Sequence, residues 1–419
     1  MQIISKLRRE IYLVLRASEK YTKTDMVYLA KGGFWTTISQ LISLILNFIV
    51  AVAFANFISK DVYGNYQYIL SIASILAVFS LNEMGTAFVR AVAQGYEGIL
   101  RKSIMLKLKW SFLITIVSFL IGIYYFINKN NTIGFSMLII GIILPINYIF
   151  KFYMPFLNGR KLFKQITFCN IITNLFYFIT ILITLFITNN IILLILAYFL
   201  SNTIVNILLY YYTIKKYKPN NNMDSNSIKY GIKLSLINVL GIIYSYIDKI
   251  LIFHYFGAID FAIYSFAVNI PNQARYILRG LEPIILPRFS KRSINDIKIY
   301  LNKKIFMSFI LILMIIIIYI LIAPFIYKLF FPEYINSIFY SQVYSLSLIG
   351  FIPVINTTIL QSQAALKQIY IYSIMMPIIS LSFVFLFINL YGIMGVIIAT
   401  IINKFIGIVF SYVLIRKMT

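Results

Sequence analysis

The sequence predicts an all-α protein that crosses a membrane many times, and three observations support this fold class. Of its 419 residues, 61% are hydrophobic and only 12% are charged, which leaves too little polar surface for a soluble protein of this length. Uncharged apolar runs of about 20 residues, the length that spans a bilayer, recur along the whole chain. These runs are continuous and do not alternate between polar and apolar residues, which argues against an outer-membrane barrel.

The chain begins with a charged segment, residues 1–33, that we expect to lie on the cytoplasmic membrane surface. Its apolar residues Ile3, Leu7, Ile11 and Val14 fall near helical spacing among lysines and arginines, as in an interfacial amphipathic helix. The first apolar run, residues 34–58, is too long for the hydrophobic region of a cleavable signal peptide.

Twelve membrane-spanning helices are predicted from the apolar runs. Turn residues rather than charges separate the fifth span from the sixth and the eleventh from the twelfth. A polar, asparagine-rich linker at 214–232 divides the spans into an N-terminal lobe, 34–213, and a C-terminal lobe, 233–415, with a short cytoplasmic tail at 416–419. The predicted spans are 34–58, 66–88, 110–128, 133–151, 165–187, 191–213, 233–256, 261–287, 305–327, 339–363, 369–389 and 393–415.

The distribution of positive charge orients these spans. With the N-terminus inside, 30 of the 37 lysines and arginines fall on the cytoplasmic side, three fall in outer loops and four lie within spans. Such a bias over short loops is the positive-inside rule, so the excess charge of +25 requires no nucleic-acid partner. Both termini are therefore predicted to be cytoplasmic.

The two predicted lobes are related in sequence. Six spans per lobe keep both lobes in the same orientation, as in parallel repeats that line a path between them. The residues that recur 199 positions later are Phe54, Phe57, Asp61 and Glu83, which match Phe253, Phe256, Asp260 and Glu282, while Arg90 recurs with a one-residue slip as Arg288.

The sequence also excludes several classes of function. No GxxxxGK[ST] phosphate-binding loop occurs, so no nucleotide hydrolysis is predicted. One histidine, His254, and one cysteine, Cys169, build neither a metal site nor a catalytic constellation, so we expect no metal, no cofactor and no enzyme activity. Short outer loops leave no room for a large extracytoplasmic active site. A transporter remains.

Charged residues within the spans are the predicted functional site, because a charge in the bilayer costs about 2.5–3.5 kcal/mol and needs a partner or a role. Arg275, Arg279, Lys249 and Lys404 are the expected substrate-binding cations of the cavity. Asp248, Glu282 and Glu83 are expected to couple ions or to form ion pairs, and Arg90 and Arg288 to lie at the interface. We predict that Asp248 pairs with Arg275, although any of these charges could equally join helices.

Several motifs resemble a known family along essentially the whole chain. They are Gly32-Gly33-Phe34-Trp35, Tyr63-Gly64-x-Tyr66, Gly85 with Arg90, and Asp248-Lys249 followed by Tyr264 and Ala267. In order and spacing they resemble the Wzx-type O-antigen and polysaccharide flippases of the multidrug/oligosaccharidyl-lipid/polysaccharide (MOP) exporter superfamily.

That resemblance implies a fold, a function and a location. The fold would be MATE-like, with two pseudo-symmetric six-helix lobes around a cavity that opens alternately to each face. The substrate would be a polyprenyl-diphosphate-linked oligosaccharide of O-antigen or a related polymer, moved across the bacterial inner membrane. Membrane lipids, a polysaccharide polymerase and a chain-length regulator would be its partners.

Three alternatives stay open. A multidrug exporter of the same superfamily would be expected to carry acids in its cavity rather than lysine and arginine. A major-facilitator sugar porter usually has a Gly-Asp-Arg-Gly-Arg-type motif after its second span, where this chain reads RAVAQGYEGILRKS. A membrane-embedded polysaccharide polymerase or ligase would need larger outer loops.

Overall fold

A computed structural model describes residues 16, 26–279, 294–363 and 365–418, and every regular element among them is a helix. The all-α prediction is therefore confirmed. The N-terminal half contains α2 (Met26–Phe57), α3 (Lys60–Leu76), η1 (Ala77–Ser80), α4 (Met84–Ala93), α5 (Ile99–Ile127), α6 (Asn131–Phe150), α7 (Tyr153–Gly159), α8 (Phe163–Ile187) and α9 (Ile191–Tyr217). The C-terminal half contains α10 (Ser225–Ile237), α11 (Val239–Arg279), α13 (Ile294–Phe330), η2 (Pro332–Tyr334), α14 (Ser337–Ser345), η3 (Leu346–Gly350), α15 (Phe351–Ser362) and α16 (Leu366–Arg416).

Ten helical stretches in the described residues are long and apolar enough to cross a membrane. Two of them contain 50 and 51 residues. At 1.5 Å per residue each would be about 75 Å long if straight, more than twice the thickness of the hydrocarbon core. Both are in fact helical hairpins, which brings the crossing segments to the predicted twelve.

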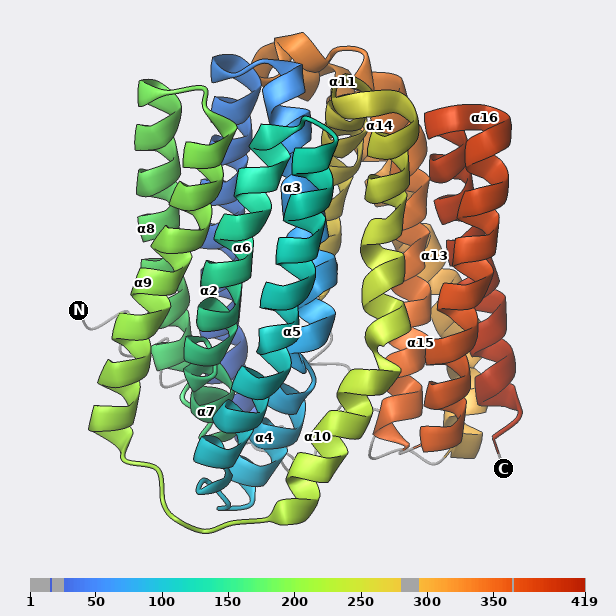
Figure 1. The fold of residues 1–419 in the computed structure, drawn as a ribbon. Helices are drawn as coiled ribbons and strands as arrows, with labels where there is room; N and C mark the ends of the chain where they lie inside the picture. The colour runs from blue at the N-terminus through green and yellow to red at the C-terminus, as the bar shows by residue number, and fades with distance from the viewer. Residues whose placement is uncertain (1–15, 17–25, 280–293, 364, 419) are drawn as a thin grey trace, which may run out of the picture.

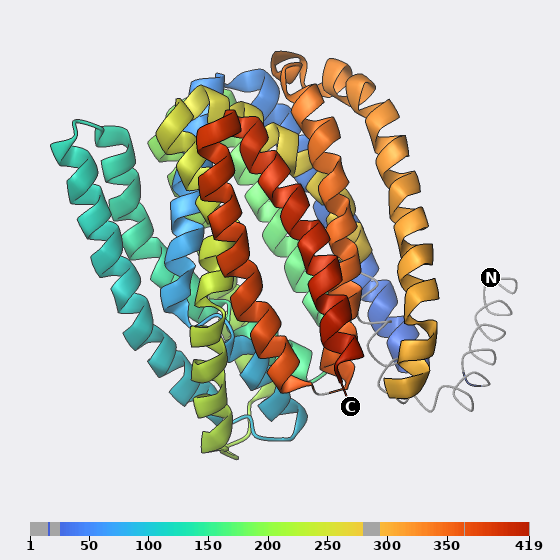
Figure 2. The ribbon, with the colours of Figure 1, turned by 90° about the vertical axis from the view of Figure 1, so that its right-hand side faces the viewer.

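A glycine folds back each of these two long helices. Gly257 in α11 has φ 82° and Gly392 in α16 has φ 58°, a region of backbone conformation that residues with a Cβ rarely adopt. The arms of α11 meet where Tyr264 donates a hydrogen bond to Asp248, and those of α16 meet where the rings of Tyr372 and Phe410 stack at 6.0 Å. Figure 2 shows the two arms of α16 side by side in red.

The bundle has two distinct ends (Figure 1). We call the end that carries the α2–α3 turn, Gly257 and Gly392 the hairpin end. The opposite end carries the short helices α4 and α7 and the extended segment between α9 and α10, and we call it the linker end. The division of the chain at 214–232 into two six-helix lobes stays a prediction.

The second crossing segment begins earlier and ends earlier than predicted. Its helix starts at Lys60, where Ser59 caps it by accepting a hydrogen bond from the Val62 amide, and it ends at Ser80 rather than at residue 88. Leu81 then takes a left-handed conformation, with φ 50°. The ammonium group of Lys107, from α5, donates a 2.6 Å hydrogen bond to the carbonyl of Ser80 and so stabilises this helix end.

The seventh crossing segment is also interrupted. The sequence predicts one span at 233–256, but α10 ends at Ile237 and α11 begins at Val239. Gly231 of α10 packs so closely on α4 that an added Cβ would lie 2.7 Å from the sulfur of Met84. The linker-end part of this segment therefore packs against the N-terminal half, which no periodicity in the sequence indicates.

Candidate functional site

Two cations predicted from the sequence contact the same short helix in the C-terminal half. The Arg275 guanidinium donates through Nη2 to both the carbonyl and the hydroxyl oxygen of Ser347, each at 3.1 Å. The Lys404 side chain passes over Gly350, where an added Cβ would lie 2.6 Å from its Cδ. Ser347 and Gly350 are three residues apart in the 3₁₀ helix η3, so both face the same side. The structure thus brings Arg275 and Lys404 to one face of η3.

Lys249 and Lys404 lie on opposite sides of the first arm of α11. Its ammonium group lies 4.9 Å from the centre of the Tyr246 ring, and Lys404 lies 5.8 Å from the ring of Tyr244. Residues two apart on a helix point about 200° from each other, so these tyrosines hold their lysines on opposite sides of α11. Each pair is a cation–π contact, which stabilises an ammonium without neutralising it.

None of these three cations forms a salt bridge with a carboxylate among the residues that the structure describes. All three side chains are half-buried within membrane-crossing helices. Positive charge in such a place ordinarily has an acidic partner. The arrangement therefore leaves the C-terminal half with net positive charge that an anionic ligand could neutralise.

The predicted ion pair between Asp248 and Arg275 is wrong in this structure. Asp248 instead accepts a 2.6 Å hydrogen bond from the Tyr264 hydroxyl, and its other carboxylate oxygen, Oδ1, is buried without a partner among the described residues. In a hairpin that turns at Gly257, Asp248 lies nine residues before the turn and Arg275 lies 18 after it. The Cα atoms of the two residues are therefore separated by about 13 Å along the helix axis.

The remaining predicted residues lie near the linker end. Glu83 accepts hydrogen bonds from Thr86 at 2.9 Å and from the Asn238 amide at 3.0 Å. Arg90 is exposed and lies over the ring of Tyr230 at 5.7 Å. Arg279 is the last residue of α11, and its side chain lies outside the description. Glu282 and Arg288 lie outside the described residues, as does most of the predicted amphipathic segment at 1–33.

An ion pair that the sequence does not reveal joins the loops of the linker end. Arg160 binds Glu97 through two hydrogen bonds, of 2.6 and 2.7 Å, and donates a third to the carbonyl of Tyr217. The backbone amide of Asn220 donates to the same carboxylate at 2.8 Å. Burial alone would raise the pKa of Glu97, but the hydrogen bonds and charge of Arg160, with the Asn220 amide, hold it below its ordinary value. Residues 63 positions apart form this pair, so only an observed contact could have identified it.

The hairpin end is closed by aromatic contacts between the two halves of the chain. Tyr63 of α3 packs on Phe266 of α11 with ring centres 4.8 Å apart, and Phe266 packs on Tyr334 at 3.9 Å. Beside them Asn56 donates a hydrogen bond to the carbonyl of Phe330. Gly64 approaches α11 so closely that an added Cβ would lie 1.9 Å from the carbonyl oxygen of Ala258. We call Tyr63, Gly64, Ala258, Phe266 and Tyr334 the hairpin-end seal.

Several solved structures with the same fold are membrane transporters. An inward-facing multidrug resistance MATE family transporter of the MOP superfamily matches with a TM-score of 0.69 and 13% identity, over 90% of this chain and 94% of that chain. The outward-facing form of such a transporter matches with a TM-score of 0.59 and 12% identity, over 93% and 97%.

A MOP superfamily transporter from Pyrococcus furiosus also matches, with a TM-score of 0.63 and 13% identity over 93% of this chain and 97% of that chain. For that protein, reverse polarity of the binding pocket suggests a different function. None of the curated proteins matches the sequence.

The model of one protein family matches residues 29–293, which is more than half of the chain, and its description is polysaccharide biosynthesis protein. This match covers the glycine and tyrosine motifs near the first two spans as well as Asp248 and Lys249. Together with the shared fold, it confirms the similarity to flippases of the MOP superfamily that the sequence indicates. The chain therefore belongs to the polysaccharide biosynthesis protein family and has the fold of MOP transporters.

Proposed function

We propose that this protein moves a polyprenyl-diphosphate-linked oligosaccharide across the bacterial inner membrane by alternating access. The observation that carries this proposal is the pair of cations on one face of η3, which lie within the membrane and have no carboxylate partner in the described structure. The guanidinium fork of arginine suits phosphate oxygens, because it can donate two hydrogen bonds at once. A diphosphate headgroup needs such compensation, since it cannot enter hydrocarbon with its charge exposed.

The other features of the site support the same substrate class. Lys249 supplies a third cation, on the opposite face of α11 from Lys404. Asp248, the acid nearest to it in sequence, is engaged by Tyr264 and does not form a salt bridge with a membrane cation in the described residues. Net positive charge within the crossing helices disfavours the binding of cationic drugs, which argues against a multidrug exporter.

The proposed cycle uses the two ends of the bundle in turn. The hairpin-end seal closes the path at one end, so the substrate enters from the linker end. The positive-inside bias of the sequence supports a cytoplasmic linker end, as predicted. Separation of Tyr63 from Phe266 and Tyr334 then opens the site to the outer face. Undoing this packing breaks no fully buried salt bridge among the seal residues. The nearby pair joins the half-buried Lys60 to the exposed Glu333.

Reconstitution tests this function. Purified protein in proteoliposomes is expected to expose a polyprenyl-diphosphate-linked sugar to an enzyme added outside, faster than protein-free vesicles do. A cell that lacks the protein should accumulate the lipid-linked repeat unit at the cytoplasmic face and offer none to its polymerase. The same vesicles should fail to accumulate cationic drugs. Drug uptake without flipping would replace the proposal with the multidrug alternative.

A further inference from the structure

Tyrosine side chains from four helices of the N-terminal half converge on one another. Tyr66 of α3 packs edge-on to Tyr198 of α9, with ring centres 6.5 Å apart, and Tyr177 of α8 packs edge-on to Tyr198 at 5.4 Å. Tyr148 of α6 is close enough to Tyr198 for the two phenol groups to interact electrostatically. Tyr246 of α11 interacts electrostatically with both Tyr148 and Tyr198. We call these five residues the tyrosine cluster.

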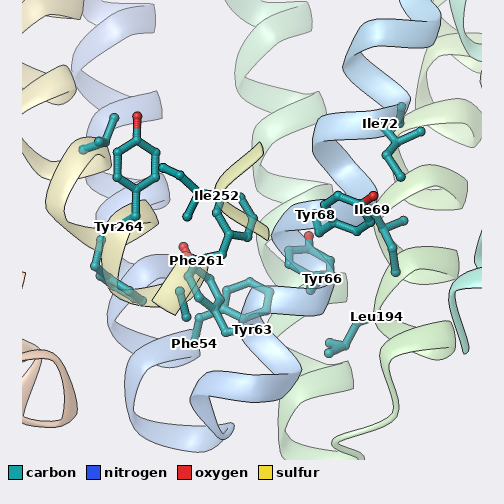
Figure 3. Packing of buried hydrophobic residues seen from close by; sticks show 14 of the residues in the cluster. Phe54, Tyr63, Tyr66, Tyr68, Ile69, Ile72, Leu194, Ile252, Phe261 and Tyr264 are labelled. Carbon is teal, nitrogen blue, oxygen red and sulfur yellow. The ribbon is translucent and has the colours of Figure 1, made fainter. Parts of the chain in front are cut away.

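The tyrosine cluster is not a sealed apolar core. Tyr148, Tyr177, Tyr198 and Tyr246 are only half-buried although they lie between helices. The Tyr66 side chain is 1% exposed, and its hydroxyl lies close to that of Tyr177 in the same cluster. Figure 3 shows this hydroxyl and that of Tyr264 pointing the same way, away from Phe54 at the hairpin end and toward the middle of the bundle. The four half-buried rings, rather than Tyr66, are therefore the part of the cluster that a ligand can reach.

One residue of the tyrosine cluster, Tyr246, contacts a cation of the crossing helices. Lys249 lies against the Tyr246 ring, so a cation and the edge of the cluster share the same face of α11. The membrane-embedded charges Lys249, Arg275 and Lys404 all belong to the C-terminal half, whereas the positions that correspond to Lys249 and Arg275 in the internal repeat are the uncharged Val50 and Leu76. Lys249 is therefore the cation on the side of α11 that carries Tyr246, whereas Lys404 lies on the opposite side with Tyr244.

We propose that the tyrosine cluster binds the sugar that is bonded directly to the diphosphate of the transported lipid. This inference rests on the proposed function. A pyranose presents polarised C–H groups on its faces and hydroxyls around its edge. An aromatic ring attracts such C–H groups through its negative face, and a tyrosine hydroxyl can exchange hydrogen bonds with the sugar edge. A headgroup neutralised near Lys249 would place its first sugar against Tyr246, Tyr148 and Tyr198.

Binding of two probes to purified protein in nanodiscs tests this inference. One probe is polyprenyl diphosphate, and the other is the same lipid carrying one N-acetylglucosamine. Wild-type protein should bind the sugar-bearing lipid more tightly than the bare lipid. The double variant Tyr177→Leu/Tyr198→Leu should lose about tenfold in affinity for the sugar-bearing lipid, or about 1.4 kcal/mol, and nothing for the bare lipid. Tyr198→Phe keeps the ring and should show a smaller loss with the same selectivity.

The matched control is Tyr211→Leu, because Tyr211 also lies on α9 but is 61% exposed on the outside of the bundle. It should change neither affinity. Equal affinity of the wild type for both probes, or an equal loss for both probes in the Tyr198→Phe protein, would overturn the inference and leave the proposed function standing. Failure of the wild type to bind either probe would instead refute the proposed function. If the double variant does not fold, the Tyr198→Phe protein tests the inference in its place. Its thermal unfolding should match that of the wild type.

Discussion

The side-chain amide of Asn238 donates a 3.0 Å hydrogen bond to Oε1 of Glu83, and this contact joins two interruptions of the helical bundle. Glu83 lies between η1 and α4, and Asn238 lies between α10 and α11. Both residues therefore sit where a crossing segment breaks, one in each half of the chain. A contact between two breaks can hold the linker-end pieces of these segments together while the hairpin-end pieces move.

Substitution of Asn238 tests this contact. Asn238→Ala removes the amide donor and should lower the free energy of unfolding by about 1 kcal/mol, because Glu83 keeps only its bond from Thr86. Asn238→Asp should cost more, since it places a second carboxylate beside Glu83. Thermal unfolding in detergent measures both. In the Glu83→Gln background, the two Asn238 variants should differ less in their free energy of unfolding. An unchanged difference would show that repulsion from Glu83 does not cause the extra loss in Asn238→Asp.

Loss of the η3 cations should stop transport without unfolding the protein. Arg275→Ala and Lys404→Ala should each lower the flipping rate at least about tenfold, because a hydrogen bond to a charged group contributes about 1.5–3 kcal/mol. Arg275→Lys should restore only part of the rate, since it keeps the charge but not the fork. Lys367→Ala is the control, because Lys367 lies on the same helix, α16, but is exposed. If Arg275→Ala protein fails to accumulate in the membrane, Arg275 is mainly a structural residue.

A methyl group at Gly64 should open the hairpin-end seal. Gly64→Ala places a Cβ 1.9 Å from the carbonyl oxygen of Ala258, so the halves must separate there. A cysteine at position 63, where Tyr63 is buried, should then react faster with an impermeant maleimide added outside the cell. The experiment uses a Cys169→Ala background, because Cys169 is the only native cysteine.

Gly33→Ala serves as the control for Gly64→Ala, since no atom lies within 4 Å of its added Cβ. It should leave the labelling rate unchanged. If the cysteine at position 63 reacts no faster in the Gly64→Ala protein, the halves do not separate at this contact.

The ion pair of Glu97 and Arg160 should make the linker end sensitive to acid. The pKa of Glu97 lies below its ordinary value of 4.5 in the folded protein, so its contribution to stability is complete above that pH. The contribution should disappear as the pH falls through the lowered pKa. The free-energy advantage of wild type over Glu97→Gln should therefore be constant near neutral pH and shrink below about pH 4.5. Thermal unfolding across this range measures it.

Arg160→Met should be destabilising at neutral pH by about 3 kcal/mol, because it leaves the Glu97 carboxylate buried without a cation. Faster proteolysis of the segment that includes Asn220 should accompany the loss, since Glu97 binds the backbone there. Unaltered proteolysis would show that the ion pair does not hold this segment in place.

The number and kind of helices could be predicted from the sequence because hydropathy reports directly on length and environment. The helix breaks could not, because they depend on contacts between distant segments, such as Lys107 with the carbonyl of Ser80. The same reason explains the wrong partner for Asp248. Charge pairing suggested Arg275, but the turn at Gly257 decides which residues of α11 face one another, and it places Tyr264 opposite Asp248. The cations themselves were identifiable, because a charge in an apolar run needs no alignment to be noticed.

Lys249, Arg275 and Lys404 form no salt bridge with a carboxylate in the described structure, and this has an electrical consequence for the transport cycle. The formal charges of these three cations and of Asp248 sum to +2, which matches the roughly two negative charges of a diphosphate. The loaded protein would then cross between its two states with almost no net movement of charge through the membrane field. The empty protein would carry its two charges back toward a negative interior, a step favoured by up to about 4–5 kcal/mol per 100 mV. Membrane voltage would thus accelerate the return of the carrier and leave the outward passage of its substrate unaffected.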